Sequence, residues 1–364
     1  MDAECSPILE SIQSCDDPWF KNIVYPEKMV RYAREGRAYC VMAEVTSYCA
    51  ASCAYCFASS DKNSSQFLPK ETLFDLVDFA EEIDAPMFAL TGGDALAHPN
   101  WEEVVIYARK KGLETGLATS WMISKAVARK IVELDVQFVC GHIDTIDPEA
   151  YAQVHTDPKT LEARILGLRN LFEAGYPKER ILTLLTITRP ILSTFPQTLD
   201  WYLNEIGIHP IGLLALKGAG FGNQHRDWEP TLEEYRWVHE HRAGKMGDLW
   251  SRTVNDVGRY FCQTHFNVHS DGRVSPCNPL REVAVGNIFE ENIREIYAQH
   301  KDFLLFNYEI EGHCGNCENN EICFGCRANA YYYLKDVRAS DPKCWWNPQA
   351  QDIYYEEAKQ VRQE

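Results

Sequence analysis

Apolar and polar positions alternate along residues 38–225 in a pattern that predicts short strands separated by helices. The strand-like stretches are rich in apolar residues, and the stretches between them repeat apolar residues at the spacing of one helical face. After Pro69, this face comprises Leu73, Leu76, Val77, Ala80 and Ile83. The expected strands are 39–45, 86–90, 113–119, 136–140, 181–188 and 211–216.

Six β-α units of this kind predict an α/β fold with a parallel sheet covered by helices. Because a closed barrel of this type has eight units, we expect a partial (β/α)6 barrel with an open side. The loops that follow the strands should carry the functional residues. Four cysteine-containing or polar stretches follow strands in this way and indicate one common site: 49–56, 92–94, Ser120 and 142–144.

The expected domain organisation has five parts. An N-terminal extension covers residues 1–38, and the partial barrel covers residues 39–225. A helical connector at 226–260 leads to a cysteine-rich domain at 261–345, and a polar helix at 346–364 ends the chain.

The composition limits what the chain binds and where it resides. With 45% hydrophobic and 24% charged residues, it has the content of an ordinary globular protein. Its formal net charge of −17 argues against non-specific binding to nucleic acid, because phosphates would be repelled. The acidic start lacks the order of a signal peptide, and no apolar run reaches the roughly 18 residues that span a membrane. We therefore expect a cytoplasmic protein, in which 14 cysteines indicate metal or redox chemistry rather than disulfides.

The most informative stretch is SYCAASCAYCF, residues 47–57, which spaces Cys49, Cys53 and Cys56 as C-x3-C-x2-C. Structural zinc takes four protein ligands, so three thiolates are one short. A cubane iron–sulfur cluster has four irons, and three thiolates leave one iron free for a substrate or cofactor. A fragment of a zinc site, or three buried cysteines, is the alternative interpretation.

This motif after a first strand resembles that of the radical S-adenosylmethionine (radical SAM) enzymes. The resemblance implies that Cys49, Cys53 and Cys56 hold a [4Fe–4S] cluster whose free iron binds the amino and carboxyl groups of S-adenosylmethionine. It also implies an external electron donor, such as flavodoxin or ferredoxin, and cleavage of the sulfonium to a 5′-deoxyadenosyl radical. Tyr55, the aromatic residue before the last cysteine, is expected to lie against the adenine.

Two further stretches are similar to cofactor-binding motifs of that family. The segment Gly92, Gly93, Asp94 resembles its Gly-Gly-Glu motif, with Asp94 in place of Glu. Glycines let a backbone approach the methionine ammonium, and a carboxylate or carbonyls accept its protons. Ser120 ends the third expected strand, where relatives often place a polar residue near the ribose or the carboxylate.

The fourth expected strand is followed by a segment that resembles a Ser-Leu-Asp-Gly motif of the family. If Asp144 is aligned with its aspartate, His142 takes the serine position and His155 falls at a later arginine. The resemblance then suggests that His142 contacts the cofactor, and a hydrogen-bonded loop histidine is the alternative interpretation.

Seven downstream cysteines closely resemble the SPASM extension of radical SAM enzymes that modify peptides and proteins. The resemblance implies two auxiliary [4Fe–4S] clusters. The inner cluster would be bound by Cys262, Cys277 and Cys326. The outer cluster would be bound by Cys314, Cys317, Cys323 and Cys344. Asp256 stands where some relatives carry a further cysteine, so the inner cluster takes Asp256 as a ligand, binds a substrate group or keeps an open iron.

A four-thiolate zinc site is the competing interpretation for part of this region, because the spacing of its central cysteines also suits zinc. The cysteines concerned are Cys314, Cys317, Cys323 and Cys326. Outside both motifs, Cys140 lies on an expected strand, where it is either a small core residue or a donor of hydrogen atoms.

The resemblance implies reductive cleavage of S-adenosylmethionine and hydrogen abstraction from a substrate, and we consider two functions that use this chemistry and one that does not. The first is oxidation or cross-linking of a peptide or protein side chain, the second is dehydrogenation or epimerisation of a small natural product or sugar, and the third is a non-catalytic iron–sulfur or zinc scaffold. Asn278 follows Cys277 where sulfatase-maturating relatives have a basic aspartate, which counts against formylglycine formation. The 38 residues before the first strand are too short for the leader-binding domain of many peptide-modifying relatives.

Overall fold

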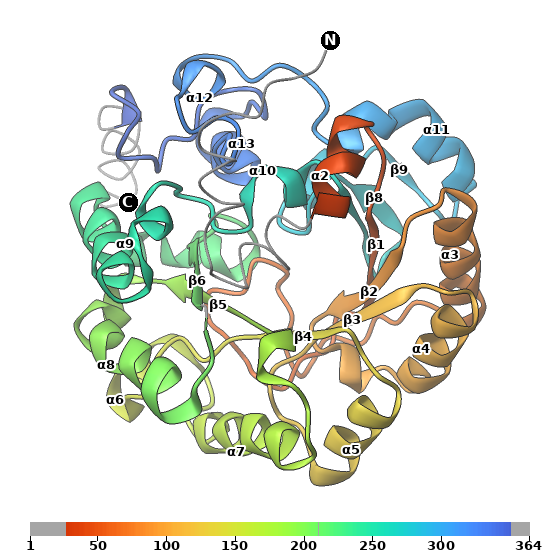
Figure 1. The fold of residues 1–364 in the computed structure, drawn as a ribbon, viewed down its shortest axis with the longest axis horizontal. Helices are drawn as coiled ribbons and strands as arrows, with labels where there is room; N and C mark the ends of the chain where they lie inside the picture. The colour runs from red at the N-terminus through yellow and green to blue at the C-terminus, as the bar shows by residue number, and fades with distance from the viewer. Residues whose placement is uncertain (1–26, 210, 351–364) are drawn as a thin grey trace.

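The computed structural model describes residues 27–209 and 211–350, and one nine-stranded sheet runs through both segments (Figure 1). The strand order is β6-β5-β4-β3-β2-β1-β7-β8-β9. The first six strands are parallel neighbours in sequence order, so each connection crosses over through helices. These strands are β1 (Cys40–Thr46), β2 (Met87–Gly92), β3 (Glu114–Ala118), β4 (Phe138–Gly141), β5 (Ile181–Ile187) and β6 (Ile211–Ala215).

Helices cover the outer face of these strands as a ring, as Figure 1 shows. The helices of the ring are α3 (Lys70–Glu82), α4 (Trp101–Lys110), α5 (Lys125–Glu133), α6 (Pro148–Val154), α7 (Thr160–Glu173) and α8 (Phe195–Asp200). Local chemistry explains where two of these helices begin. Pro69 precedes α3, and the Ser124 side chain accepts the Val127 N–H as the N-cap of α5. The predicted α/β class with a partial parallel barrel is confirmed.

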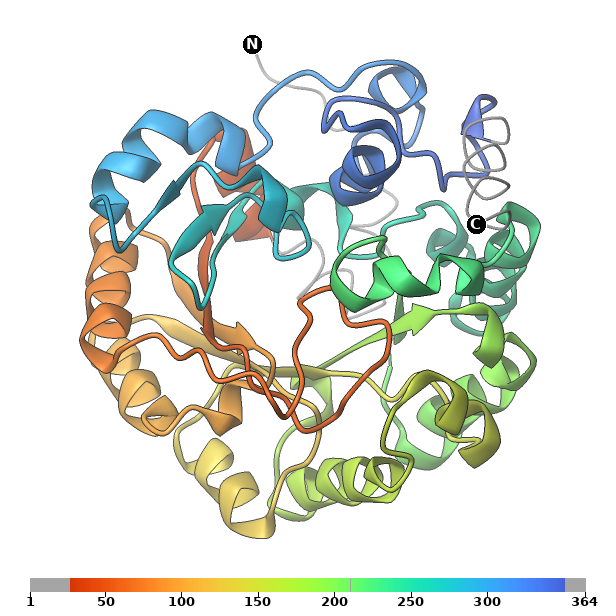
Figure 2. The ribbon, with the colours of Figure 1, turned by 180° about the vertical axis from the view of Figure 1, so that it is seen from behind.

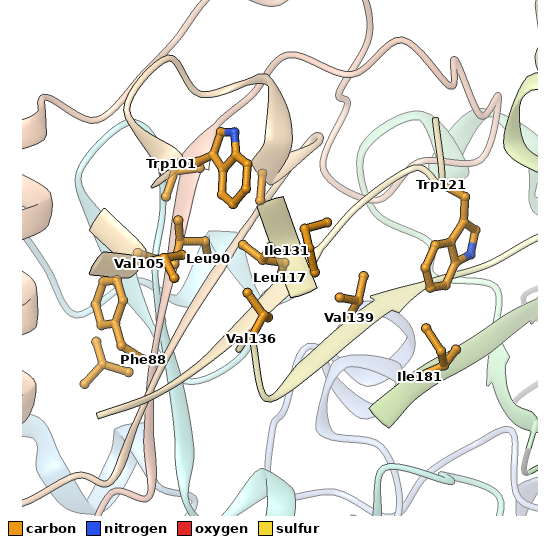
Figure 3. Close-up of a cluster of buried hydrophobic side chains, with 14 of the residues drawn as sticks. Phe88, Leu90, Trp101, Val105, Leu117, Trp121, Ile131, Val136, Val139 and Ile181 are labelled. Atoms are coloured by element: carbon orange, nitrogen blue, oxygen red, sulfur yellow. The ribbon is translucent and has the colours of Figure 1, made fainter. Parts of the chain in front are cut away.

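The main core lies between the strands and this ring, and part of it is drawn in Figure 3. Strand β5 shows how one side faces the core: Ile181, Leu185 and Ile187 are buried, whereas Leu182 and Leu184 are only half-buried. Because successive side chains point to opposite faces of a strand, the half-buried residues face the barrel interior. The interior is therefore partly open, while the helix-covered face is fully packed.

The cysteine-rich region extends the barrel sheet. Strand β7 (His265–Val268) pairs in parallel with β1, with His265 opposite Cys40, and β8 (Arg273–Ser275) and β9 (Gly286–Asn287) continue the sheet in antiparallel pairing. The six strands predicted from the sequence are all present, but β7 was not among them. Strand β7 has only four residues, which is too short for a detectable alternation of apolar and polar positions. Its partner β1 also lies more than 200 residues away in the chain.

Of the remaining helices, α12 and α13 lie between α9 and α2 at the open side of the barrel, and α11 lies beside α3 (Figure 1). These remaining helices are α2 (Glu27–Arg34), α9 (Leu232–Met246), α10 (Gly258–Cys262), α11 (Ile293–Leu304), α12 (His313–Asn316) and α13 (Arg327–Leu334). Among residues 27–209 and 211–350, no helix has the length and apolar content needed to cross a membrane. The helix expected at 346–364 lies mostly outside the described residues.

Candidate metal centres and cofactor site

The three-cysteine loop follows β1 and crosses the middle of the ring of strands, where Figure 2 shows it as the orange trace. Its backbone is held by hydrogen bonds from Cys49 N to the Asp61 carbonyl at 3.0 Å and from Cys56 N to the Cys53 carbonyl at 3.2 Å. The Cys49 sulfur itself accepts the Ala51 N–H at 3.4 Å. The loop therefore has a defined backbone conformation.

The three thiols lie close enough to influence one another. Burial raises the pKa of Cys49 to about 12, and the charges of Asp94 and Cys56 contribute in the same direction. Burial also raises the pKa of Cys53, with Cys49 and Cys56 again contributing. None of the cysteines in the described part of the chain forms a disulfide. Thiols gathered in this way become thiolates when a cation neutralises them, so the donor set fits an iron–sulfur cluster.

The glycine pair after β2 lies directly against this loop. Gly93 N donates to the Thr46 carbonyl and Asp94 N to the Tyr48 carbonyl, each at 2.8 Å. A Cβ added to Gly93 would lie 2.2 Å from the Tyr48 oxygen, so no larger residue fits there. Gly92 adopts a φ of +138°, and a Cβ there would lie 2.3 Å from the Thr46 oxygen. Close approach of the two loops therefore requires both glycines.

Asp94 and Ser120, predicted from separate motifs, are in direct contact. Asp94 Oδ2 accepts the Ser120 hydroxyl at 2.5 Å, the Ser120 N–H at 3.1 Å and the Thr119 hydroxyl at 3.3 Å. Its other oxygen accepts the Leu96 N–H at 3.1 Å. The carboxylate thus fixes the ends of β2 and β3 relative to each other.

His142, Asp144 and Tyr55 form a second group beside the loop. The Tyr55 hydroxyl donates to Asp144, and the other Asp144 oxygen lies 3.0 Å from His142 Nδ1 and accepts the Thr186 N–H at 2.9 Å. Burial raises the pKa of Asp144 to about 7 and, together with the charge of Arg164, lowers the pKa of His142 to about 3. Tyr55 is buried by this arrangement, and its predicted contact with adenine stays a prediction.

Several of the seven downstream cysteines lie close enough to influence one another. In the inner set, burial raises the pKa of Cys277, and Cys262 and Cys326 contribute in the same direction. In the outer set, burial raises the pKa of Cys344, followed by the charge of Asp341 and then by Cys323 and Cys314. Cys323 also influences Cys262 of the inner set, and the two ligand sets stay predictions. The placement of Cys317 beside the outer set stays a prediction, since its sulfur is recorded only as an acceptor from Asn319 N at 3.4 Å.

Two family models match the chain over these same regions. Residues 43–201 match the radical SAM superfamily, and residues 261–327 match an iron–sulfur cluster-binding domain, SPASM. The chain belongs to the radical SAM superfamily. It is an enzyme of that class, with a SPASM domain behind the partial barrel.

Among curated proteins, this radical SAM chain is similar to two that are named for tetrapyrrole products. It is 26% identical to an "AdoMet-dependent heme synthase" of Methanosarcina barkeri, with 84% of this chain and 95% of that protein covered. It is 23% identical to an "Fe-coproporphyrin III synthase" of the same organism, with 92% and 93% covered.

Two solved structures share the fold. Streptococcus suis SuiB bound to the precursor peptide SuiA has a TM-score of 0.64 at 14% identity, over 88% of this chain and 79% of that one. The protein anSMEcpe, with bound AdoMet and a peptide, has a TM-score of 0.61 at 18% identity, over 88% and 96%. At these identities the likeness is one of fold.

Arg164, on α7, is a site residue that the motif analysis missed in this radical SAM chain. It is fully buried, donates to the His142 carbonyl and to the Tyr151 hydroxyl at 3.1 Å, and lies 3.5 Å from His155 Nε2. Its Nε has no partner, and it makes no ion pair with a carboxylate among the described residues. Arg164 is influenced by the charge of Asp144 but makes no direct ion pair among the described residues, so the guanidinium can accept a further anionic partner. The available signal was a lone arginine between Leu161 and Leu168 on an apolar helix face.

His155 also belongs to this site, though at its edge. Its Nδ1 lies 3.2 Å from the Ala51 carbonyl, its ring stacks on Tyr151 at 3.9 Å, and its backbone bridges to Cys53. The residue that the resemblance aligned with a family arginine therefore supports the cysteine loop and contacts Arg164.

The Asp256 carboxylate is fully engaged in contacts within the protein. Both of its oxygens accept hydrogen bonds from the fully buried Arg242, one of them at 3.1 Å, and it also accepts the Leu213 N–H of β6. Thr253 adds a hydroxyl contact at 3.4 Å. The carboxylate thus neutralises a buried guanidinium and anchors β6, and the binding of an inner cluster by Cys262, Cys277 and Cys326 stays a prediction.

Cys140 lies on β4 and faces the partly open barrel interior between Ala118 of β3 and Leu182 of β5. Burial alone raises the pKa of its thiol to about 12. The side chain is half-buried and stands two residues before His142. Its role as a hydrogen-atom donor stays a prediction.

Proposed function

We propose that this radical SAM enzyme abstracts hydrogen from a small, flat and largely apolar molecule of the tetrapyrrole class. The likeness to the heme synthase of Methanosarcina barkeri carries the proposal, because it spans 84% of this chain and 95% of that protein. The barrel interior supports it, since half-buried apolar side chains line the face opposite the packed core. These are Met42, Phe138, Leu182, Leu184 and Leu214.

The cofactor site assigned to this function has two parts. Cys49, Cys53 and Cys56 would hold a [4Fe–4S] cluster, which when bound supplies the electron that cleaves S-adenosylmethionine. Gly92 and Gly93 bring their backbone against the cysteine loop, where the methionine ammonium would bind.

The opposite side of the cofactor site is polar. Arg164 offers the guanidinium for the methionine carboxylate, because it is buried without an anionic partner in the described chain. Ser120 and His142 stand at the ends of β3 and β4 as polar groups within this site, and Tyr55 with Asp144 would orient the loop against the nucleoside.

Two auxiliary [4Fe–4S] clusters complete the proposal, one on the inner set and one on the outer set with Cys317. Both would be reduced and oxidised through an external donor such as flavodoxin or ferredoxin. A cytoplasmic location and the absence of nucleic-acid partners stay predictions from composition.

A peptide substrate, the first function suggested by the sequence, is the second candidate. SuiB and anSMEcpe were solved with peptides, but at 14% and 18% identity they support the fold and not the substrate. The tetrapyrrole is therefore favoured.

The test uses anaerobically reconstituted full-length protein with Fe-coproporphyrin III as the probe. We expect a shift of the porphyrin absorption band on binding and faster formation of 5′-deoxyadenosine when the probe, S-adenosylmethionine and reductant are present together. The variant Cys49→Ala should keep the absorption shift and lose the 5′-deoxyadenosine. Absence of both effects with the probe, together with turnover of a peptide, would reverse the preference between the two candidates.

A further inference from the structure

The segment that follows β6, residues 216–222, contacts both cysteine regions. On one side Phe221 N donates to the Cys56 carbonyl at 2.9 Å, and a Cβ on Gly220 would lie 2.4 Å from the Phe57 oxygen. On the other side Lys217 reaches the inner set of SPASM cysteines. This segment therefore carries a cation from the barrel to an auxiliary site.

Lys217 makes two specific contacts. Its Nζ lies 3.1 Å from Cys326 Sγ and 2.9 Å from Asn329 Oδ1. Its charge also reaches Cys277, where it opposes the increase in pKa caused by burial. Among the described residues it forms no ion pair with a carboxylate. The ammonium is thus directed at the sulfurs of the inner set.

The position of Lys217 is held by its surroundings. Asn329 Nδ2 donates to the Asp341 carboxylate at 3.2 Å, which turns the amide oxygen of Asn329 toward Lys217. Asp341 Oδ2 in turn accepts the N–H of Cys326 at 2.7 Å. Cys326, Asn329 and Lys217 therefore belong to one hydrogen-bond network, which holds the lysine side chain in place.

The outer set has a different environment. Backbone groups donate to two of its sulfurs, Asp341 N to Cys314 Sγ at 3.3 Å and Asn319 N to Cys317 Sγ at 3.4 Å, and the Ser340 side chain also interacts with Cys314. The buried carboxylate of Asp341 lies close to this set, since its charge contributes to the raised pKa of Cys314 and Cys344. Asp341 therefore lies near both sets, and the inner set is distinguished by the Lys217 ammonium at Cys326 Sγ.

We infer that Lys217 raises the reduction potential of the inner auxiliary cluster and makes it the more readily reduced of the two. This inference rests on the proposed assignment of the clusters. One-electron reduction adds negative charge to a cluster and its thiolates, and hydrogen bonds and cations at the sulfurs stabilise the reduced form. The more readily reduced cluster then lies on the barrel side, at the carboxyl end of β6.

The experiment is a potentiometric titration of reconstituted full-length protein followed by EPR, with iron per chain measured on the same samples. The outer signal is assigned from Cys344→Ala. Lys217→Met should shift the inner couple to a more negative potential by about 59 mV or more, a tenfold loss of electron affinity for one electron. The outer couple should stay unchanged in the same sample. Lys217→Arg should stay near the wild type, and Lys217→Gln, which keeps a donor without the charge, should fall between.

The outcomes separate this inference from the cluster assignment. An assembled inner cluster whose potential is the same in wild type, Lys217→Met and Lys217→Gln would overturn the inference alone, as would equal shifts of the inner and outer couples. If Lys217→Met fails to assemble its inner cluster, the potentials of the inner cluster in Lys217→Gln and Lys217→Arg are compared instead. Equal potentials in these two variants would reject the inference. Wild-type protein without an inner cluster would overturn the assignment and the inference together.

Discussion

At the scale of single residues, the chain places buried charges where ligands of opposite charge are needed. Arg164 and Arg242 are both fully buried, yet only Arg242 has a carboxylate partner, Asp256. A buried guanidinium without a carboxylate partner lowers the stability of the fold. We therefore interpret Arg242 as part of a structural ion pair and propose Arg164 as part of a binding site. Substitutions can test both interpretations.

Replacing Arg164 should weaken binding of S-adenosylmethionine. We predict that Arg164→Met raises the dissociation constant about tenfold or more, because a hydrogen bond to a charged group contributes about 1.5–3 kcal/mol. Calorimetry on oxygen-free, unreduced protein measures it. The exposed Arg169, on the same helix, provides the control Arg169→Met, which should leave the affinity unchanged. An unchanged affinity in folded Arg164→Met protein would remove Arg164 from the site.

Replacing Asp256 should destabilise the fold without removing iron. We predict that Asp256→Ala lowers the free energy of unfolding by about 3–5 kcal/mol, because Arg242 is left buried and unpaired. Asp200→Ala, which removes the exposed partner of Lys245, should cost about 1 kcal/mol or less. Denaturant titration compares the variants. If Asp256→Ala instead lost iron from the inner cluster at unchanged stability, Asp256 would be a ligand.

The sequence indicated the candidate cysteine ligands directly but not the charged residues that surround them. Cysteine spacing is local, so Cys49, Cys53 and Cys56 could be recognised directly. Arg164 and Lys217 acquire their roles through contacts with His142 and Cys326, which are distant in sequence and depend on packing. Only the unusual position of Arg164 on an apolar helix face left a signal.

At the scale of elements, the site depends on loops that pack without side chains between them. The glycines after β2 lie against the cysteine loop, and Gly220 after β6 lies against its far end. These contacts fix how closely β1, β2 and β6 present their loops. Substitution of one such glycine tests whether the approach matters for the cofactor.

We predict that Gly93→Ala abolishes binding of S-adenosylmethionine and lowers iron at the first site, because the added Cβ would lie 2.2 Å from the Tyr48 oxygen. The matched control is Gly244→Ala on α9, where nothing lies within 4 Å. That change should increase stability by roughly 1 kcal/mol, since alanine favours a helix interior over glycine. Iron per chain and binding of S-adenosylmethionine are the measurements. Full binding by Gly93→Ala would show that the loops need not touch.

The barrel elements could be predicted from the sequence because each strand is a short apolar run, and the helices between the strands begin and end at recognisable residues. The predicted strand 181–188, for instance, is observed as Ile181–Ile187, and Ser124 caps α5. Strand β7 was missed because its partner β1 lies far away in the chain. Long-range pairing of a four-residue strand leaves no local pattern.

At the scale of the whole molecule, the continuous sheet joins the cofactor site to the cysteine-rich region. The pairing of β1 with β7 makes the two family regions share one sheet, and residues 216–222 contact both the three-cysteine loop and the inner set. The radical SAM loop and the inner set are therefore held by the same framework. This arrangement suits an enzyme in which one site starts the reaction and another exchanges electrons with it.

The central claim is that three thiolates leave one iron free to bind and cleave S-adenosylmethionine. The direct measurement is formation of 5′-deoxyadenosine by anaerobically purified, reduced protein, with metal content determined on the same sample. We predict about twelve irons per chain, as expected for three [4Fe–4S] clusters, and 5′-deoxyadenosine from the wild type but none from Cys53→Ala. Bound zinc in place of iron, or an intact cluster that never yields 5′-deoxyadenosine, would contradict the account.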